Sequence, residues 1–151
     1  MKNQSMFRLS SPAYLGGAQY PDKYACVGLG ISPPLEFSGI PEGAKSLSLV
    51  LEDPDAPDGT YVHWIMWNIP LVSRIREDSV PEGALQGVNT AGTNRYESPC
   101  PPYGTHRYIF SAYALDTVLS LSPEAERIDL DKAMNGHVLA SAAFIGLRSK
   151  K

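Results

Sequence analysis

The stretch SLSLVLED (residues 46–53) decides how this chain folds. Its apolar residues recur with a period of two, so that Leu47, Leu49 and Leu51 share one face of a β-strand. Asp53 falls on the same face, where the strand ends. A carboxylate at the end of an apolar face is destabilising unless it has hydrogen-bonding partners. The pattern therefore predicts a core strand that ends in a partnered carboxylate.

A second strand is predicted over VHWIMWNI (residues 62–69), which is apolar on both faces, as is typical of a central strand covered on both sides. Alternation places Trp64 and Trp67 on opposite faces, so at least one of them should lie in the core. Pro70 ends the strand because proline has no N–H to donate. Four residues are expected to share the odd-numbered face: His63, Ile65, Trp67 and Ile69.

HRYIFSAYAL (residues 106–115) predicts a third strand. His106 and Tyr108 point the same way, about 6.6 Å apart along the strand. Arg107 points to the opposite face.

The rest of the chain is expected to form shorter elements. The first third is rich in turns and includes a short strand over Met6–Leu9. A helix is expected over Leu130–Leu139, where Gly136 is an awkward interior residue, and a last strand over Ala142–Arg148. His137, in or just after this helix, is interpreted as structural.

The composition is that of one globular domain spanning residues 1–151, with 43% apolar and 19% charged residues. Thirteen prolines and thirteen glycines favour turns and short β-elements over long helices. The formal net charge of −3 does not favour nucleic acid or an anionic membrane as partner. A bound anion would therefore have to be held by a local site.

Cys26 and Cys100 are too few for a disulfide framework. No signal peptide is evident at the N-terminus, and no apolar stretch approaches the length of a membrane span. We therefore expect a cytoplasmic protein with two reduced thiols. Cys100 is expected to be either an inert packed thiol or a reactive one.

Polar side chains gather at the ends of the predicted strands, namely Asp53, His63, His106 and Tyr108. Two proline-rich loops flank them, DPDAPDG (residues 53–59) and SPCPPYG (residues 98–104). Prolines stiffen such loops and lower the entropy lost when a ligand binds. We therefore expect a preformed polar pocket.

DPDAP (residues 53–57), VHW (62–64) and CPPYGTHRY (100–108) together resemble the phosphatidylethanolamine-binding protein family, also called Raf kinase inhibitor protein-like. Within the family, the chain is similar to the compact bacterial and archaeal branch over nearly its whole length. The resemblance implies a mostly β fold, with a large antiparallel sheet packed on a smaller one and one or two short helices. It also implies a pocket for phosphate-bearing or other small anionic ligands.

By motif position, the resemblance implies seven ligand-binding residues: Asp53, Asp55, Pro57, His63, Pro102, His106 and Tyr108. It implies no cofactor. The segment that follows GTN (residues 92–94) is shorter than is usual in this branch. Arg95 or Tyr96 is therefore expected to reach the pocket rim.

The expected chemistry is recognition of an anion by charged histidines. A carboxylate beside two histidines should raise the pKa of both and favour imidazolium at neutral pH. Imidazolium N–H groups, the Tyr108 hydroxyl and backbone amides would then donate to phosphate oxygens. Anion affinity should fall as the pH rises through the pKa of the histidines.

Three functional classes follow from these residues. The first is a binding and regulatory module, since the resemblance implies that such proteins can inhibit a kinase or a protease by contact. The second is a hydrolase or transferase in which Asp and His act as acid and base on a phosphate ester. The third is a metal protein with two histidines and one carboxylate as ligands. No stable membrane insertion is expected, and a homodimer stays open.

Overall fold

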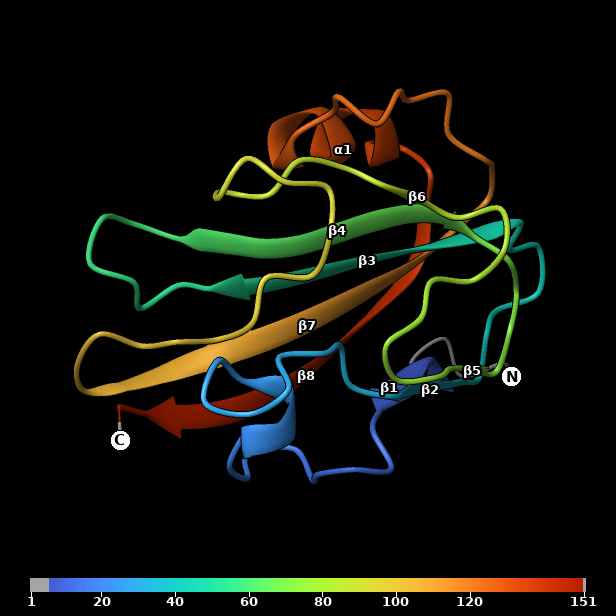
Figure 1. The fold of residues 1–151 in the computed structure, drawn as a ribbon. Helices are drawn as coiled ribbons and strands as arrows, with labels where there is room; N and C mark the ends of the chain where they lie inside the picture. The colour runs from blue at the N-terminus through green and yellow to red at the C-terminus, as the bar shows by residue number, and fades with distance from the viewer. Residues whose placement is uncertain (1–5, 151) are drawn as a thin grey trace.

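Two antiparallel sheets and one α-helix make up residues 6–150, the part of the chain that the computed structural model describes (Figure 1). The large sheet has the strand order β6-β4-β3-β7-β8 and the small sheet the order β1-β2-β5. The strands of the large sheet are β3 (Ser46–Asp53), β4 (Tyr61–Ile69), β6 (Leu85–Gln86), β7 (Thr105–Leu115) and β8 (Val138–Ser149). Those of the small sheet are β1 (Arg8–Ser10), β2 (Leu35–Ser38) and β5 (Arg74–Ile75). The expected mostly β fold is confirmed.

The large sheet is covered on both faces, which explains the double-sided apolar pattern of β4. Figure 1 shows helix α1 (Arg127–Met134) over one face and the small sheet over the other. Trp64 lies in the core between the sheets, whereas Trp67 packs with Leu130 of α1. Both tryptophans are buried, in agreement with their expected positions on opposite faces.

Two irregularities in β4 change which face its end residues occupy. The pairing of β3 with β4 shifts register at both ends, and Asn68 has a positive φ of 55°. Ile69 consequently joins Trp64 in the core between the sheets. His63 is turned to the same side, where its ring meets that of Tyr108. The expected common face for His63, Ile65, Trp67 and Ile69 is therefore wrong at both of its ends.

The sequence pattern misplaced several boundaries. The helix spans Arg127–Met134 rather than Leu130–Leu139, because Gly136 adopts a left-handed φ of 84° and turns the chain into β8. Strand β8 accordingly begins at Val138, not at Ala142.

Some local details complete these corrections. The first strand begins at Arg8 instead of Met6. At the start of α1, Asp129 accepts a hydrogen bond from the Glu126 N–H, which closes a capping box. Within residues 6–150, no helix is long and apolar enough to cross a bilayer.

Cys26 and Cys100 form a disulfide, so the expectation of two reduced thiols is wrong. The cysteines are 74 residues apart in the sequence, yet their Cα atoms lie 5.4 Å apart. The fold places the loop after the 3-10 helix (Asp22–Tyr24) beside the proline-rich loop that precedes β7. The disulfide also removes the thiol-based support for a cytoplasmic location, which stays a prediction.

Candidate ligand-binding site

Three neighbouring strands of the large sheet bring the polar residues to one end of the molecule. Strand β3 runs toward this end, whereas β4 and β7 run away from it, because both pair with β3 in antiparallel fashion. The last residue of β3 therefore meets the first residues of the other two strands (Figure 1, left). A cavity of about 390 Å³ opens at this point.

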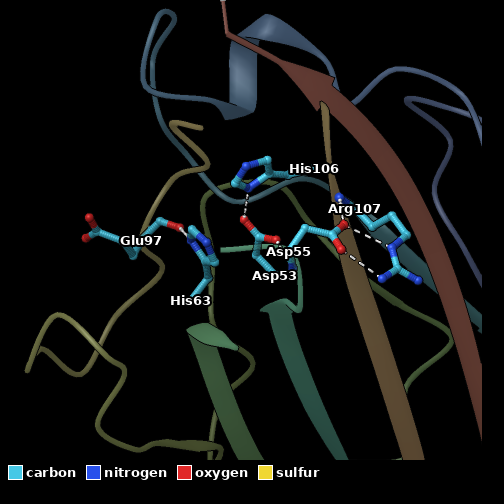
Figure 2. A network of polar contacts seen from close by, with 6 residues as sticks. All are labelled: Asp53, Asp55, His63, Glu97, His106 and Arg107. Carbon is cyan, nitrogen blue, oxygen red and sulfur yellow. Dashed lines mark hydrogen bonds and ion pairs between the residues drawn. The ribbon is translucent and has the colours of Figure 1, made fainter. Parts of the chain in front are cut away.

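Most of the predicted site residues line this cavity. Asp53, Pro57, His63, Pro102, His106 and Tyr108 all contribute to its wall. Asp55 does not belong to the lining. Figure 2 shows Asp53 turned toward the histidines and Asp55 turned away toward Arg107.

Asp53 and His106 form a buried pair at the inner end of the cavity. The Nδ1 atom of His106 lies 2.6 Å from Oδ2 of Asp53, and both side chains are at most 4% exposed. An ionised carboxylate only accepts hydrogen bonds, so His106 donates through Nδ1. The Asp55 backbone N–H donates to Oδ1 of Asp53 at 2.8 Å. Both carboxylate oxygens are thus partnered, and Nε2 of His106 has no partner within residues 6–150.

His63 is held through the main chain rather than by a carboxylate. Its Nδ1 donates to the Glu97 carbonyl oxygen, 2.7 Å away. Burial lowers the pKa of His63, and the Glu97 hydrogen bond and the Asp53 charge oppose this shift without reversing it. The expected rise in the pKa of His63 is therefore wrong. A neutral His63 with its proton on Nδ1 offers Nε2 as an acceptor.

Tyr108 lies between the two histidines. Its ring centre is 5.5 Å from that of His63 and 6.3 Å from that of His106. Burial and then the negative charge of Asp53 raise the pKa of its hydroxyl. The hydroxyl consequently keeps its proton at neutral pH and remains a hydrogen-bond donor.

Asp55 binds a residue of the protein itself. Its carboxylate accepts three hydrogen bonds from Arg107, one from the backbone N–H and two from the guanidinium group (Figure 2). These bonds lower the pKa of Asp55 to about 2. Asp55 thereby ties the DPDAPDG loop to β7 from outside the cavity, and its assignment to the ligand-binding set stays a prediction.

Arg95 and Tyr96, at the start of the short segment after residues 92–94, do not reach the cavity rim as expected. The Asn89 side chain donates to the Arg95 carbonyl oxygen and accepts from the Thr93 N–H, which fixes this segment against the sheet. Tyr96 is drawn inward and packs edge-on against Trp64, with ring centres 5.4 Å apart. Arg95 lines a separate pocket. Neither residue lines the cavity.

Other residues line the cavity wall in their stead, and the period-two pattern of the predicted strands did not indicate them. Further wall residues are Tyr61, at the start of β4, and five residues of the loops around the cavity: Asp58, Thr90, Glu97, Ser98 and Cys100. Most of these loop positions carry no periodic signal. For Cys100 and Ser98 the sequence did indicate a place beside the pocket, because both lie within the SPCPPYG motif.

The charges of the wall are mostly negative. The lining includes three acidic residues, Asp53, Asp58 and Glu97, and within the described chain it includes no lysine or arginine. His63 is neutral at neutral pH for the reason given above. An anion in this cavity would therefore meet few fixed positive charges.

The residues are not arranged as a metal site. Within residues 6–150, no group of three or more His, Cys, Asp or Glu side chains has an arrangement that could hold a metal ion. The alternative of a metal protein has no support in this geometry.

Comparison with known proteins gives relatives over nearly the whole chain. A UPF0098 protein of Methanothermobacter thermautotrophicus is 48% identical over 145 residues, which cover 92% of this chain and 96% of the relative. A UPF0098 protein of Chlamydia trachomatis is 48% identical over 149 residues, or 95% and 99% of the two chains.

Solved structures with the same fold are also known. A crystal structure from Chlamydia trachomatis, described as that of a phosphatidylethanolamine-binding protein homologue, superposes with a TM-score of 0.93 at 46% identity and covers 97% of this chain and 99% of that one. Escherichia coli YbcL, described as a member of the mammalian family, gives a TM-score of 0.90 at 30% identity, with 97% and 100% covered. The model of the phosphatidylethanolamine-binding proteins matches residues 10–149. The chain therefore belongs to the phosphatidylethanolamine-binding protein family.

Proposed function

We propose that the cavity binds a small phosphate-bearing ligand of the phosphoethanolamine type, and that the protein is a binding module of a regulatory kind. The observation that carries this proposal is the buried Asp53–His106 pair, which faces the same cavity as His63 and Tyr108. Inhibition of a kinase or a protease by contact belongs to the proposal only through the family resemblance.

The polar groups of the cavity suit an oxygen-rich ligand with at least one proton to donate. Asp53 accepts from Nδ1 of His106 and leaves Nε2 of this ring for the ligand, where an imidazolium N–H would donate to a phosphate oxygen in a charge-assisted hydrogen bond. The Tyr108 hydroxyl supplies a second donor. Neutral His63 accepts through Nε2, either from a P–OH group or from an ammonium group.

The negative wall favours a ligand that brings its own positive charge. A phosphate dianion alone would be repelled by Asp53, Asp58 and Glu97. An ammonium group on the same ligand offsets this repulsion. Phosphoethanolamine should therefore bind more tightly than inorganic phosphate at the same pH.

Binding without turnover fits the local hydrogen bonding. Within the described chain, the hydrogen bonds of the two histidines go to Asp53 and to the Glu97 carbonyl oxygen, and none goes to a hydroxyl or thiol. Nucleophilic catalysis needs a base within hydrogen-bond reach of the nucleophile. We therefore favour the binding module over the hydrolase or transferase.

Isothermal titration calorimetry tests this proposal directly. Wild type, His106→Ala and His137→Ala are titrated with phosphoethanolamine, inorganic phosphate and ethanolamine. His137→Ala is the matched control, since His137 is exposed and pairs with Asp116 outside the cavity lining. We expect phosphoethanolamine to bind best, His106→Ala to lose about tenfold or more in affinity, and His137→Ala to bind like wild type. Absence of binding by wild type at millimolar ligand would contradict the proposal.

A further inference from the structure

We infer that the Cys26–Cys100 disulfide is a thiol-exchange site built into the wall of the cavity, and that its reduction weakens ligand binding. The expected loss of affinity after reduction rests on the proposed function, whereas the expected loosening of the cavity wall does not. The reactant is a small dithiol or a redox protein with a dithiol pair.

The disulfide lies where a reductant can reach it and where its loss matters. Cys100 is part of the cavity lining, between Ser98 and Pro101. Both cysteines are exposed residues. A thiolate from solvent therefore has access to the sulfur atoms, as thiol–disulfide exchange requires.

The wall segment formed by residues 98–103 has few other attachments. Within the described chain, its backbone takes part in one hydrogen bond, from the Cys26 N–H to the Pro99 carbonyl oxygen at 3.0 Å. The neighbouring backbone hydrogen bonds lie outside the segment, on either side of it. The Glu97 N–H donates to the His63 carbonyl oxygen on one side, and Thr105 enters β7 on the other. The disulfide and this backbone hydrogen bond thus both lead to Cys26, and the segment's other ties are the packing of the buried Pro99 and Pro101 and the contact of the Tyr103 ring with that of His106, 6.1 Å between centres.

The segment that precedes Cys26 is held in place by side-chain hydrogen bonds and an ion pair. Arg148, which is 3% exposed, donates to the Tyr20 carbonyl oxygen at 2.9 Å and pairs with Asp22 at 2.8 Å. The buried Tyr24 donates through its hydroxyl to Glu77 at 2.9 Å. The disulfide consequently fastens a weakly held wall to a well-held loop.

The reaction balances as a two-electron reduction of the protein. A thiolate of the dithiol attacks the sulfur of one cysteine, the S–S bond breaks, and the other cysteine leaves as a thiolate that takes up a proton. The second thiol of the reductant, as a thiolate, then attacks the reductant's sulfur in the mixed disulfide, this S–S bond breaks, and the first cysteine leaves as a thiolate that also takes up a proton. The products are two cysteine thiols in the protein and one disulfide in the reductant.

Reduction should weaken binding because the wall segment becomes less ordered. A released segment samples more conformations, and ordering it again reduces the net free energy of binding. By linkage, a bound ligand should make the disulfide harder to reduce by the same factor.

The test compares oxidised and dithiothreitol-treated wild type, with thiol titration to verify each state. We expect phosphoethanolamine to bind about fivefold or more weakly after reduction. A Cys26→Ser, Cys100→Ser double variant should bind like reduced wild type and ignore the reductant. Hydrogen exchange provides a readout without ligand: the Cys26 amide, which donates to the Pro99 carbonyl oxygen, should exchange faster after reduction, while the amides of β3 should not change.

The two readouts separate the failure of this inference from the failure of the proposed function. Equal affinity and unchanged exchange in both redox states would overturn the inference, as would a disulfide that resists dithiothreitol in the folded protein. If oxidised wild type fails to bind phosphoethanolamine, the proposed function fails. Hydrogen exchange then tests the attachment of the wall by itself, and faster exchange of the Cys26 amide upon reduction would still support the inference.

Discussion

The two ends of β4 carry the same kind of irregularity and use it differently. At the far end, the bulge at Asn68 turns Ile69 into the core between the sheets. At the cavity end, the register shift turns His63 toward Asp53 and Tyr108. The same kind of register shift thus completes the core at one end of β4 and helps to form a candidate site at the other.

The difference between the ends lies in what happens to the polar atoms. The Asn68 side chain donates to the Leu119 carbonyl oxygen at 2.9 Å and accepts from the Leu119 N–H at 2.8 Å. Within residues 6–150, His63 and His106 use only Nδ1. An end that satisfies its polar groups internally serves stability, whereas an end that directs spare acceptors and donors into a cavity can bind a ligand.

The largest expected effect is at the far end. Ile69→Ala removes a side chain that is 0% exposed, and we expect the free energy of unfolding to fall by about 2–5 kcal/mol because a cavity is left in the core. Affinity for phosphoethanolamine should stay within about twofold of wild type. Urea denaturation and calorimetry measure the two quantities. A variant that keeps its stability but no longer binds phosphoethanolamine would contradict the difference proposed between the two ends of β4.

Asp53→Asn is the corresponding change at the cavity end. The amide can still accept from His106 but brings no negative charge, so the charge-assisted hydrogen bond that orients His106 is lost and affinity should drop about tenfold, which corresponds to about 1.4 kcal/mol. The free energy of unfolding should fall by about 1–3 kcal/mol, since a buried charged hydrogen bond is replaced by a neutral one. Asp116→Asn is the matched control, because the same substitution at an exposed carboxylate that pairs with His137 lies outside the cavity lining and should leave affinity unchanged.

The pH dependence of stability should reveal the lowered pKa of His63. A histidine with a lower pKa in the folded state binds protons more readily when unfolded, so stability falls as the pH drops from about 6.5 toward the lowered pKa. The contribution of one proton has a slope of at most about 1.4 kcal/mol per pH unit. His63→Gln keeps a donor for the Glu97 carbonyl and removes the titration. Denaturation between pH 7 and 5 should therefore show a shallower decline in this variant, and equal declines would contradict the assignment.

The smallest effect is expected for the exposed pair outside the cavity. Arg107→Ala should change Tm by no more than about 2 °C, because exposed ion pairs contribute little. NMR titration is the sharper measurement. The pKa of Asp55, held at about 2 by Arg107, should rise toward its ordinary value in the variant. An unchanged pKa would show that Arg107 does not hold this carboxylate.

Much of the fold was predictable from the sequence because period-two patterns report which face of a strand is buried. SLSLVLED coincides with β3, and β7 starts one residue before its predicted strand. The bulges were not predictable, since a register shift leaves no mark in the alternation itself. The helix was displaced because Gly136 acts as a left-handed terminator, whereas the pattern placed it inside the helix.

The site was predictable in its inner residues and not in its walls. Asp53, His106 and Tyr108 follow from strand faces and from the quoted motifs. The disulfide was not predictable, because two cysteines 74 residues apart give no indication that their loops adjoin. The direction of the pKa shift of His63 also depends on burial, which the spacing of carboxylates and histidines does not report.

The central claim is that the cavity end of the sheet binds a phosphate-bearing ligand through its histidines. NMR titration of wild type and His106→Ala with phosphoethanolamine, observed at the imidazole resonances, tests it most directly. We predict saturable shifts at His63 and His106 in wild type, none at His137, and at least a tenfold weaker response of His63 in the variant. Absence of shifts at His63 and His106 at millimolar ligand, or equal shifts at all three histidines, would contradict the claim.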